Sequence, residues 1–263
     1  MINLGFLQFS PVYKDPDTNL DRIVILLQGC GDAIMVLPEL CLTGYDLDKQ
    51  GFSYLGEDLS TSNRLEFIAS LCKELNLKIV LGFAERDGDN LYNSAAFVTP
   101  QGIKHVYRKA HLFHKEKGIF DRGDTGFHVI VDGGVSYGIL LCYDWAFPEA
   151  ARTLAFKGAE VILHPANLVL PYGQRAMRTR SLENRVFSVT ANRVGTEGDL
   201  IFTGRSQIVD VSGDILASFD TEEEGAQVVK INPQDAMDKW LTKQTCETDG
   251  NNLFNDRRPD LYK

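Results

Sequence analysis

The chain has 263 residues, of which 44% are hydrophobic and 24% charged, and its formal net charge is −9. These values are ordinary for a soluble globular protein, and the acidic balance argues against a nucleic-acid-binding protein, which needs a basic face. The chain opens on a strand-like segment without a basic leader and contains no long apolar span, so we expect a cytoplasmic protein that does not enter a membrane. Five cysteines without regular spacing favour a reducing compartment over a disulfide framework.

The first half of the sequence predicts strands and helices in alternation. Short apolar runs indicate buried strands, whereas apolar residues at spacings of three and four indicate one face of a helix. Strands are expected at residues 2–9, 34–37, 79–83, 91–99 and 103–107, and helices at residues 20–27 and 65–75. The last two strands are joined by a Pro-Gln-Gly turn, which predicts a hairpin.

The second half repeats this order. Strands are expected at residues 135–141, 161–164, 186–193, 207–211, 215–219 and 226–231, and helices at residues 148–157 and 172–184. Alternating strands and helices predict an α/β protein whose sheets are covered by helices, and two such halves bury their sheets most economically against each other. No flexible linker separates them, so we expect one domain over residues 1–263.

Three reactive side chains follow predicted strands directly. Glu39 comes after the strand at 34–37, Lys109 after the hairpin, and Cys142 at the end of the apolar run 135–141. Ligands of open α/β sheets bind at this carboxyl edge. Pro148 suits the first turn of a helix, so the thiol faces a strand-to-helix turn.

The three groups together have a clear chemical logic. A carboxylate can take the proton of a thiol as general base. An ammonium lowers the thiol pKa and stabilises a developing oxyanion, and the thiolate attacks an electrophilic carbon to form a covalent intermediate. Each residue alone has an ordinary structural role, so only the combination indicates catalysis.

The sequence around these residues resembles the nitrilase, or carbon–nitrogen hydrolase, superfamily over essentially the whole chain. The three motifs are LPELCLTGY at residues 37–45, YRKAHLF at 107–113 and CYDWAFPE at 142–149. The resemblance implies a four-layer α-β-β-α sandwich with pseudo-twofold internal symmetry. It also implies a homodimer or larger homo-oligomer, in which the polar tail at residues 246–263 reaches the partner subunit.

The resemblance also assigns roles within the site. Glu39 is the implied general base, Lys109 the oxyanion stabiliser and Cys142 the nucleophile, and the backbone N–H of Tyr143 completes the oxyanion hole. Glu116 matches the second glutamate of the family, which positions the lysine or the attacking water. This chemistry needs no cofactor, and the five histidines form no metal-binding pattern.

The implied activity is hydrolysis of a small amide to a carboxylic acid and ammonia through a cysteine thioester. Three alternatives stay open: an aliphatic nitrilase that acts on small nitriles, an N-carbamoyl amino acid amidohydrolase, and a catalytically silent scaffold. The amide and the nitrile reach the same thioester, and the nitrile passes through a thioimidate first. The expected partner is therefore a small amide or nitrile substrate.

Candidate substrate-binding residues lie close to the three motifs. Asn167 follows the strand at 161–164, so internal symmetry matches its position to that of Glu39; its side chain would hydrogen-bond an amide or else stabilise a turn. An aromatic wall around a small substrate, or ordinary core packing, is expected of Tyr45, Phe113, Trp145 and Phe147. Three arginines either bind a substrate carboxylate or lie exposed on the helix at 172–184; they are Arg175, Arg178 and Arg180.

Overall fold

The computed structural model describes residues 1–242 and 250–262. The longer helices are α1 (Pro16–Leu26), α2 (Lys49–Leu55), α3 (Asn63–Leu75), α4 (Pro148–Phe156) and α5 (Gly173–Asn184). Strands of the first sheet are β1 (Ile2–Gln8), β2 (Ala33–Val36), β3 (Lys78–Asp87), β4 (Asn90–Thr99), β5 (Gly102–Arg108) and β14 (Gly225–Ile231). Those of the second sheet are β6 (Val129–Asp132), β7 (Val135–Ile139), β8 (Val161–Ala166), β9 (Phe187–Asn192), β12 (Gln207–Val209) and β13 (Ile215–Ser218).

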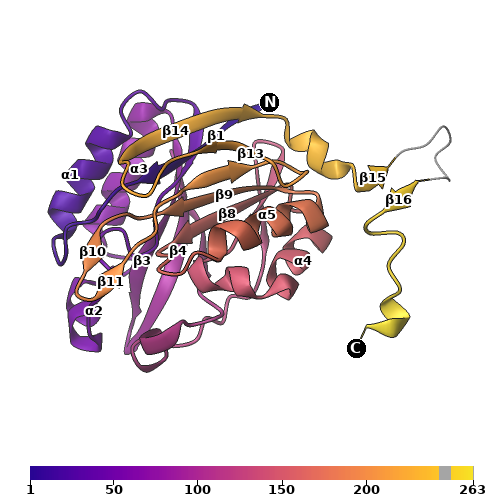
Figure 1. Ribbon diagram of the computed structural model, residues 1–263. Helices are drawn as coiled ribbons and strands as arrows, with labels where there is room; N and C mark the ends of the chain where they lie inside the picture. The colour runs from indigo at the N-terminus through magenta and orange to yellow at the C-terminus, as the bar shows by residue number, and fades with distance from the viewer. Residues whose placement is uncertain (243–249, 263) are drawn as a thin grey trace.

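The molecule is built of four layers (Figure 1). Helices α1 and α3 cover the outer face of the sheet β14-β1-β2-β3-β4-β5, and α4 and α5 cover the outer face of the sheet β13-β12-β9-β8-β7-β6. The inner faces of the two sheets share one hydrophobic core. The predicted α-β-β-α sandwich is therefore confirmed.

The alternation of side chains along each strand explains the layers. In β2, Ile34 and Val36 enter the core between the sheets, whereas Ala33 and Met35 pack against the helices. Successive side chains of a strand point to opposite faces, and a strand that is buried on both faces reads as a continuous apolar run. The short runs of the sequence therefore correspond to strands that lie between two layers.

The two sheets repeat one topology, as the internal symmetry predicts. Strands β1, β2 and β3 pair in parallel, and so do β7, β8 and β9. An antiparallel pair then extends each sheet on one side, β4-β5 in the first and β12-β13 in the second. On the other side, β14 lies antiparallel to β1 and β6 antiparallel to β7. The carboxyl ends of β2 and β8 consequently occupy equivalent positions.

Several elements differ from the sequence expectation. Strand β6 and the short helix α2 were not predicted, although the Gly133-Gly134 turn between β6 and β7 is a hairpin signal. Strand β7 ends at Ile139 and not at the thiol, because the chain leaves the sheet to enter the 3-10 turn Cys142–Ala146. Strand β14 ends the second half of the sequence yet joins the first sheet.

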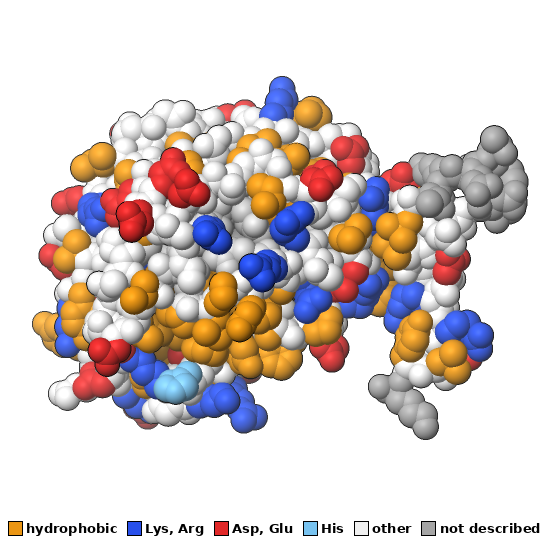
Figure 2. Space-filling view, viewed as in Figure 1, with side chains coloured by type: hydrophobic (Ala, Val, Ile, Leu, Met, Phe, Trp, Pro, Cys, Tyr) orange, Lys and Arg blue, Asp and Glu red, His pale blue; other side chains and the backbone are white. Residues whose placement is uncertain are grey.

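The predicted tail at 246–263 lies partly outside the described residues. Its described part, residues 250–262, lies at one side of the sandwich (Figure 1). The ring centroid of Phe254 is 4.8 Å from that of Phe156 in α4. Hydrophobic side chains also gather around the region of α4 on the face seen in Figure 2. The homodimer stays a prediction.

Among the described residues, no helix combines the length and the apolar character that crossing a bilayer requires.

Candidate active site

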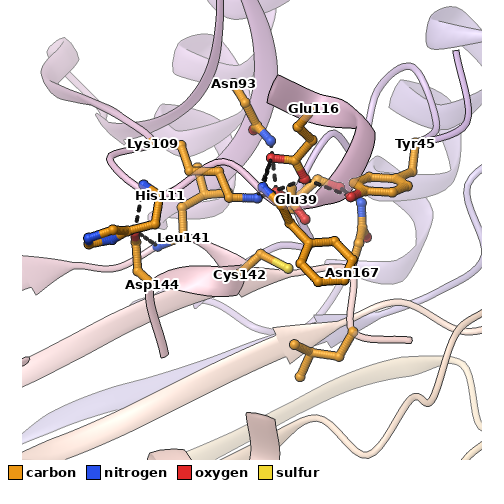
Figure 3. A network of polar contacts seen from close by, with 12 residues as sticks. Glu39, Tyr45, Asn93, Lys109, His111, Glu116, Leu141, Cys142, Asp144 and Asn167 are labelled. Carbon is orange, nitrogen blue, oxygen red and sulfur yellow. Dashed lines mark hydrogen bonds and ion pairs between the residues drawn. The ribbon is translucent and has the colours of Figure 1, made fainter. Parts of the chain in front are cut away.

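The three reactive residues of the sequence meet at one end of the sandwich (Figure 3). Glu39 follows β2 and Lys109 follows β5, so both come from the first sheet, whereas Cys142 follows β7 of the second sheet. All three side chains are almost completely buried. The site therefore lies between the two sheets, and neither half of the sequence contains it alone.

Lys109 is held by two carboxylates. Its Nζ donates to Oε1 of Glu39 at 2.6 Å and to both oxygens of Glu116 at 2.9 and 2.8 Å. Glu116 also accepts the hydroxyl of Tyr45 at 2.6 Å, and Oε1 of Glu39 accepts Nδ2 of Asn93 at 2.8 Å. The ammonium is thus fixed in direction as well as in charge, since hydrogen bonds between ionised groups are short and strong.

The backbone of Glu39 is fixed by its neighbours on both sides. Asn167 donates its Nδ2 to the carbonyl of Glu39 at 2.8 Å. On the other side, a Cβ atom at Gly82 of β3 would lie 2.4 Å from the Cα atom of Glu39. Only glycine allows so close a backbone approach. Because Gly82 has no side chain, the backbone of Glu39 can pack directly against β3.

Cys142 occupies a strained backbone conformation at the start of its 3-10 turn. Its φ angle is +42°, a region that non-glycine residues rarely adopt and that clusters at functional sites. The carbonyl of Cys142 is 2.9 Å from Nε2 of His164, whose Nδ1 lies 3.0 Å from Oγ1 of Thr190. The turn therefore presents the thiol to the cluster and is anchored from strand β8.

A buried carboxylate behind the thiol was not predicted from the sequence. Asp144 accepts hydrogen bonds from the backbone N–H of Leu141 at 2.9 Å and from the hydroxyl of Tyr107 at 2.7 Å, and its other oxygen lies 2.7 Å from Nδ1 of His111. The acid stands three residues after Leu141, which lacks the hydroxyl of a capping box. The sequence therefore carries no local signal that could have identified it.

A small pocket opens beside the thiol, with a volume of about 20 Å³, room for about one water molecule. Its walls are formed by Phe113, Cys142, Tyr143, Trp145, Asn167, Leu168, Val169 and Leu170. Of the predicted substrate-binding residues, Phe113, Trp145 and Asn167 line it. Tyr45 instead binds Glu116, and Phe147 stacks on His111 with ring centroids 3.6 Å apart.

Comparison with known proteins agrees with the family that the three sequence motifs resemble. The family model described as carbon–nitrogen hydrolase matches residues 3–238. A nitrilase from Pyrococcus abyssi is 40% identical over 266 residues, which cover 100% of this chain and 99% of that protein.

The chain belongs to the carbon–nitrogen hydrolase family. An (R)-stereoselective amidase from a Pseudomonas species is 38% identical, with 77% of this chain and 76% of that protein covered. The crystal structure of an amidase from a Nesterenkonia species superposes with a TM-score of 0.80 at 25% identity, and 90% of this chain and 92% of that one are covered. The family predicted from the three motifs, and with it an enzyme that hydrolyses carbon–nitrogen bonds, is thus confirmed.

Burial governs the electrostatics of this carbon–nitrogen hydrolase site. It raises the pKa of Glu39, and the nearby Lys109 ammonium offsets only part of that effect. Burial alone would lower the pKa of Lys109, but the charges of Glu116 and Glu39 raise it above its ordinary value. The lysine is therefore a permanent cation, and it balances one of two adjacent carboxylates.

The thiol is protonated in the resting enzyme. Burial raises the pKa of Cys142 well above its ordinary value, and the negative charge of Glu39 raises it further. Lys109 and a backbone hydrogen bond from Asn167 act in the opposite direction but are weaker. The thiol can thus lose its proton only when an adjacent base takes it, and Glu39 is the carboxylate whose charge acts on it most strongly.

The three arginines of α5 are engaged elsewhere. Arg178 donates to the carbonyl of Gly213 and Arg180 to Glu183 and to the carbonyl of Trp145. Arg175 lines a separate surface pocket. Within residues 1–242 and 250–262, no group of three or more His, Cys, Asp and Glu side chains is arranged to hold a metal ion.

Proposed function

We propose that this enzyme hydrolyses a small, uncharged amide to a carboxylic acid and ammonia through a thioester on Cys142. The observation that carries the proposal is the meeting of a buried thiol, a buried carboxylate and a carboxylate-bound ammonium beside an apolar pocket. One oxygen of Glu39, Oε2, is buried and has no hydrogen-bond partner. A lone pair is therefore free to take the thiol proton.

The first stage forms the thioester. Glu39 takes the proton of Cys142 as the sulfur attacks the amide carbon, and the carbonyl oxygen becomes an oxyanion. Lys109 and the backbone N–H of Tyr143 stabilise that charge. Glu39 then passes the proton to the nitrogen, the carbon–nitrogen bond breaks, and ammonia leaves.

The second stage restores the enzyme. A water molecule takes the place of ammonia and gives a proton to Glu39 as its oxygen attacks the thioester carbon. The carbon–sulfur bond breaks, the acid is released, and the proton returns to the sulfur of Cys142. Glu116 keeps Lys109 in place throughout, because it binds the ammonium with both oxygens.

The pocket favours a neutral acyl group. Among the described residues that line it, none is charged, and most of its wall is aromatic or aliphatic. A carboxylate or an ammonium on the substrate would lose its hydration there and find no partner. Burial of an unpaired neutral polar group already costs about 2–7 kcal/mol, and burial of an unpaired charge costs more. An N-carbamoyl amino acid is for this reason the less favoured substrate.

Similar proteins support the amide as substrate. A Glu→Gln and Cys→Ala double mutant of the Nesterenkonia amidase has been observed in complex with acrylamide, and its Glu→Gln mutant with the acetamide moiety of fluoroacetamide added at the active-site cysteine. The nitrilase from Pyrococcus abyssi makes a small aliphatic nitrile the second candidate. The intact set of reactive side chains weighs against a silent scaffold, which would need none of them.

The test is ammonia release from matched pairs of small amides and nitriles, followed by intact-mass analysis of the protein. We expect release from neutral amides and an acyl adduct on the wild-type chain. The Cys142→Ala variant should fold normally and lose turnover by at least about 1,000-fold. Glu39→Gln should keep the fold and bind amide but lose turnover, because no carboxylate then passes the proton of the thiol to the leaving nitrogen.

The outcomes separate the candidates. Faster release from nitriles would assign the enzyme as a nitrilase, and turnover restricted to charged carbamoyl substrates would contradict the neutral pocket. Retained turnover in Cys142→Ala would refute the nucleophile. Inactivity of the wild-type enzyme on every class, with no adduct, would leave the scaffold as the remaining explanation.

A further inference from the structure

Asn167 holds an unused acceptor in the pocket wall. Its backbone N–H donates a hydrogen bond to Cys142, and its Nδ2 donates one to the carbonyl of Glu39. Its Oδ1 is buried and has no hydrogen-bond partner, although the residue is only 3% exposed and lines the pocket beside the thiol. An unpaired buried acceptor is unfavourable, so this atom requires an explanation.

The orientation of the amide group is determined by its neighbour. The partner of Nδ2 is a backbone carbonyl of Glu39, which only accepts hydrogen bonds. The NH₂ group must therefore face Glu39, and a flipped amide is excluded. The acceptor Oδ1 is therefore the atom left without a partner, on a residue that lines the pocket.

A second free acceptor stands on the same side of the site. Oε2 of Glu39 is also buried and unpaired, and both residues lie close to Cys142, because the charge of Glu39 and a backbone hydrogen bond from Asn167 act on its thiol. In the proposed reaction the oxyanion faces the donors Lys109 and Tyr143. The nitrogen of the tetrahedral intermediate then faces Glu39, which gives it the proton, and the acceptor Oδ1 of Asn167.

We propose that Oδ1 of Asn167 accepts an N–H of the substrate and so selects primary amides over nitriles and esters. A primary amide carries N–H donors on its nitrogen, so one of them can bind Asn167 while the nitrogen lies beside Glu39. The nitrogen of a nitrile and the alkoxy oxygen of an ester carry none, so they leave the buried acceptor unpaired. A site built for a hydrogen bond rejects substrates that lack it. This inference rests on the proposed function, because it requires the amide at Cys142.

The test compares propionamide with methyl propionate, which have the same acyl group. In Asn167→Ala we expect the ratio of kcat/KM for the amide to that for the ester to fall about five- to tenfold, as the loss of one hydrogen bond predicts. The matched control is Asn93→Ala. Asn93 also donates its Nδ2 to Glu39, at 2.8 Å, but it does not line the pocket, so both rates should fall together and the ratio should stay constant.

The outcomes of this test separate the role of Asn167 from the amidase activity itself. An equal loss on amide and ester in Asn167→Ala would show that the residue only supports Glu39, and the inference would be overturned while the amidase stands. A wild-type enzyme inactive on propionamide and on all other neutral amides would remove both.

A binding measurement covers the case in which Asn167→Ala is too poorly active to assay. In the Cys142→Ala variant, calorimetry should give tighter binding of propionamide than of propionitrile or methyl propionate by about five- to tenfold. Adding Asn167→Ala should abolish that preference. Equal affinities for the three compounds in Cys142→Ala would overturn the inference.

Discussion

At the residue scale, burial decides the charge state of several side chains around the thiol. His164 lies wholly inside the protein, where it joins the carbonyl of Cys142 to Thr190. Burial lowers the pKa of His164 to about 4, since the charged imidazolium would lose its hydration. The turn that carries the nucleophile is therefore anchored by a neutral imidazole.

The lowered pKa of His164 makes the folded protein less stable in acid. In the unfolded chain His164 binds a proton below about pH 6.5, whereas in the folded protein it does so only below about pH 4. The unfolded state is thus favoured as the pH falls from 6.5 to 4, and up to about 3 kcal/mol of the free energy of unfolding is lost. The loss is absent above pH 6.5 and complete below pH 4.

The variant His164→Gln tests this effect, because glutamine retains an N–H donor for the carbonyl of Cys142 and does not titrate. Denaturant unfolding at pH 7.5 and at pH 4.5 should show a smaller loss of stability in the variant than in the wild type. The same loss in both proteins would assign the acid sensitivity to other groups.

At the element scale, the connection from β7 to α4 is organised by the carboxylate of Asp144. It gathers the backbone N–H of Leu141 and the side chains of Tyr107 and His111 around one buried charge. Two of these partners come from the chain around β5, so the segment that carries Lys109 is tied to the turn that carries Cys142. Hydrogen bonds to a buried charge are stronger than neutral ones.

Tyr107→Phe tests the strength of this tie. It removes one hydrogen bond to Asp144 and should lower the free energy of unfolding by about 2 kcal/mol. Tyr137→Phe is the control, because Tyr137 is equally buried between the sheets and its hydroxyl forms no hydrogen bond with the described residues. Urea unfolding that gave equal changes in the two variants would contradict the role of Asp144.

At the scale of the whole molecule, a buried ion pair fastens the second half of the chain to the first. Arg193 follows β9 and pairs with Glu197, and Glu197 also accepts the backbone N–H groups of Tyr45 and Asp46 at 2.7 and 2.8 Å. The guanidinium lies 4.0 Å from the ring centroid of Phe202. Because Tyr45 holds Glu116, the pair supports the cluster at the active site from a distance.

Glu197→Gln should therefore destabilise the whole protein by about 3 kcal/mol, because it leaves Arg193 buried without its counter-charge. The double variant Arg193→Met/Glu197→Gln should recover much of that loss in urea unfolding. In the exposed pair of Arg258 and Asp260, Asp260→Asn should cause no measurable change, since exposed ion pairs contribute little. A single Glu197→Gln variant as stable as the wild type would refute the support role.

The sequence by itself determined the family, the layers of the fold and the residues at the strand ends. Apolar runs such as residues 34–37 reveal strands buried on both faces, because burial of both faces removes the polar alternation. Glu39 and Cys142 were predictable because each follows such a run within a recognisable motif, and Lys109 because it follows the predicted hairpin within another. The equivalence of Asn167 and Glu39 was predictable from the repeated order of elements.

Only the tertiary structure decided which side chains meet and what each one does there. Asp144 looked like one acid among many until its partners from β5 and from the segment after β7 were brought together. Phe113 and Phe147 have the same side chain, yet one lines the pocket and the other stacks on His111. Strand β14 joins the sheet that is distant in sequence. Periodicity records which face of an element is buried, whereas the partner across that face depends on how the two sheets pack, and contacts between distant residues leave no local pattern in the chain.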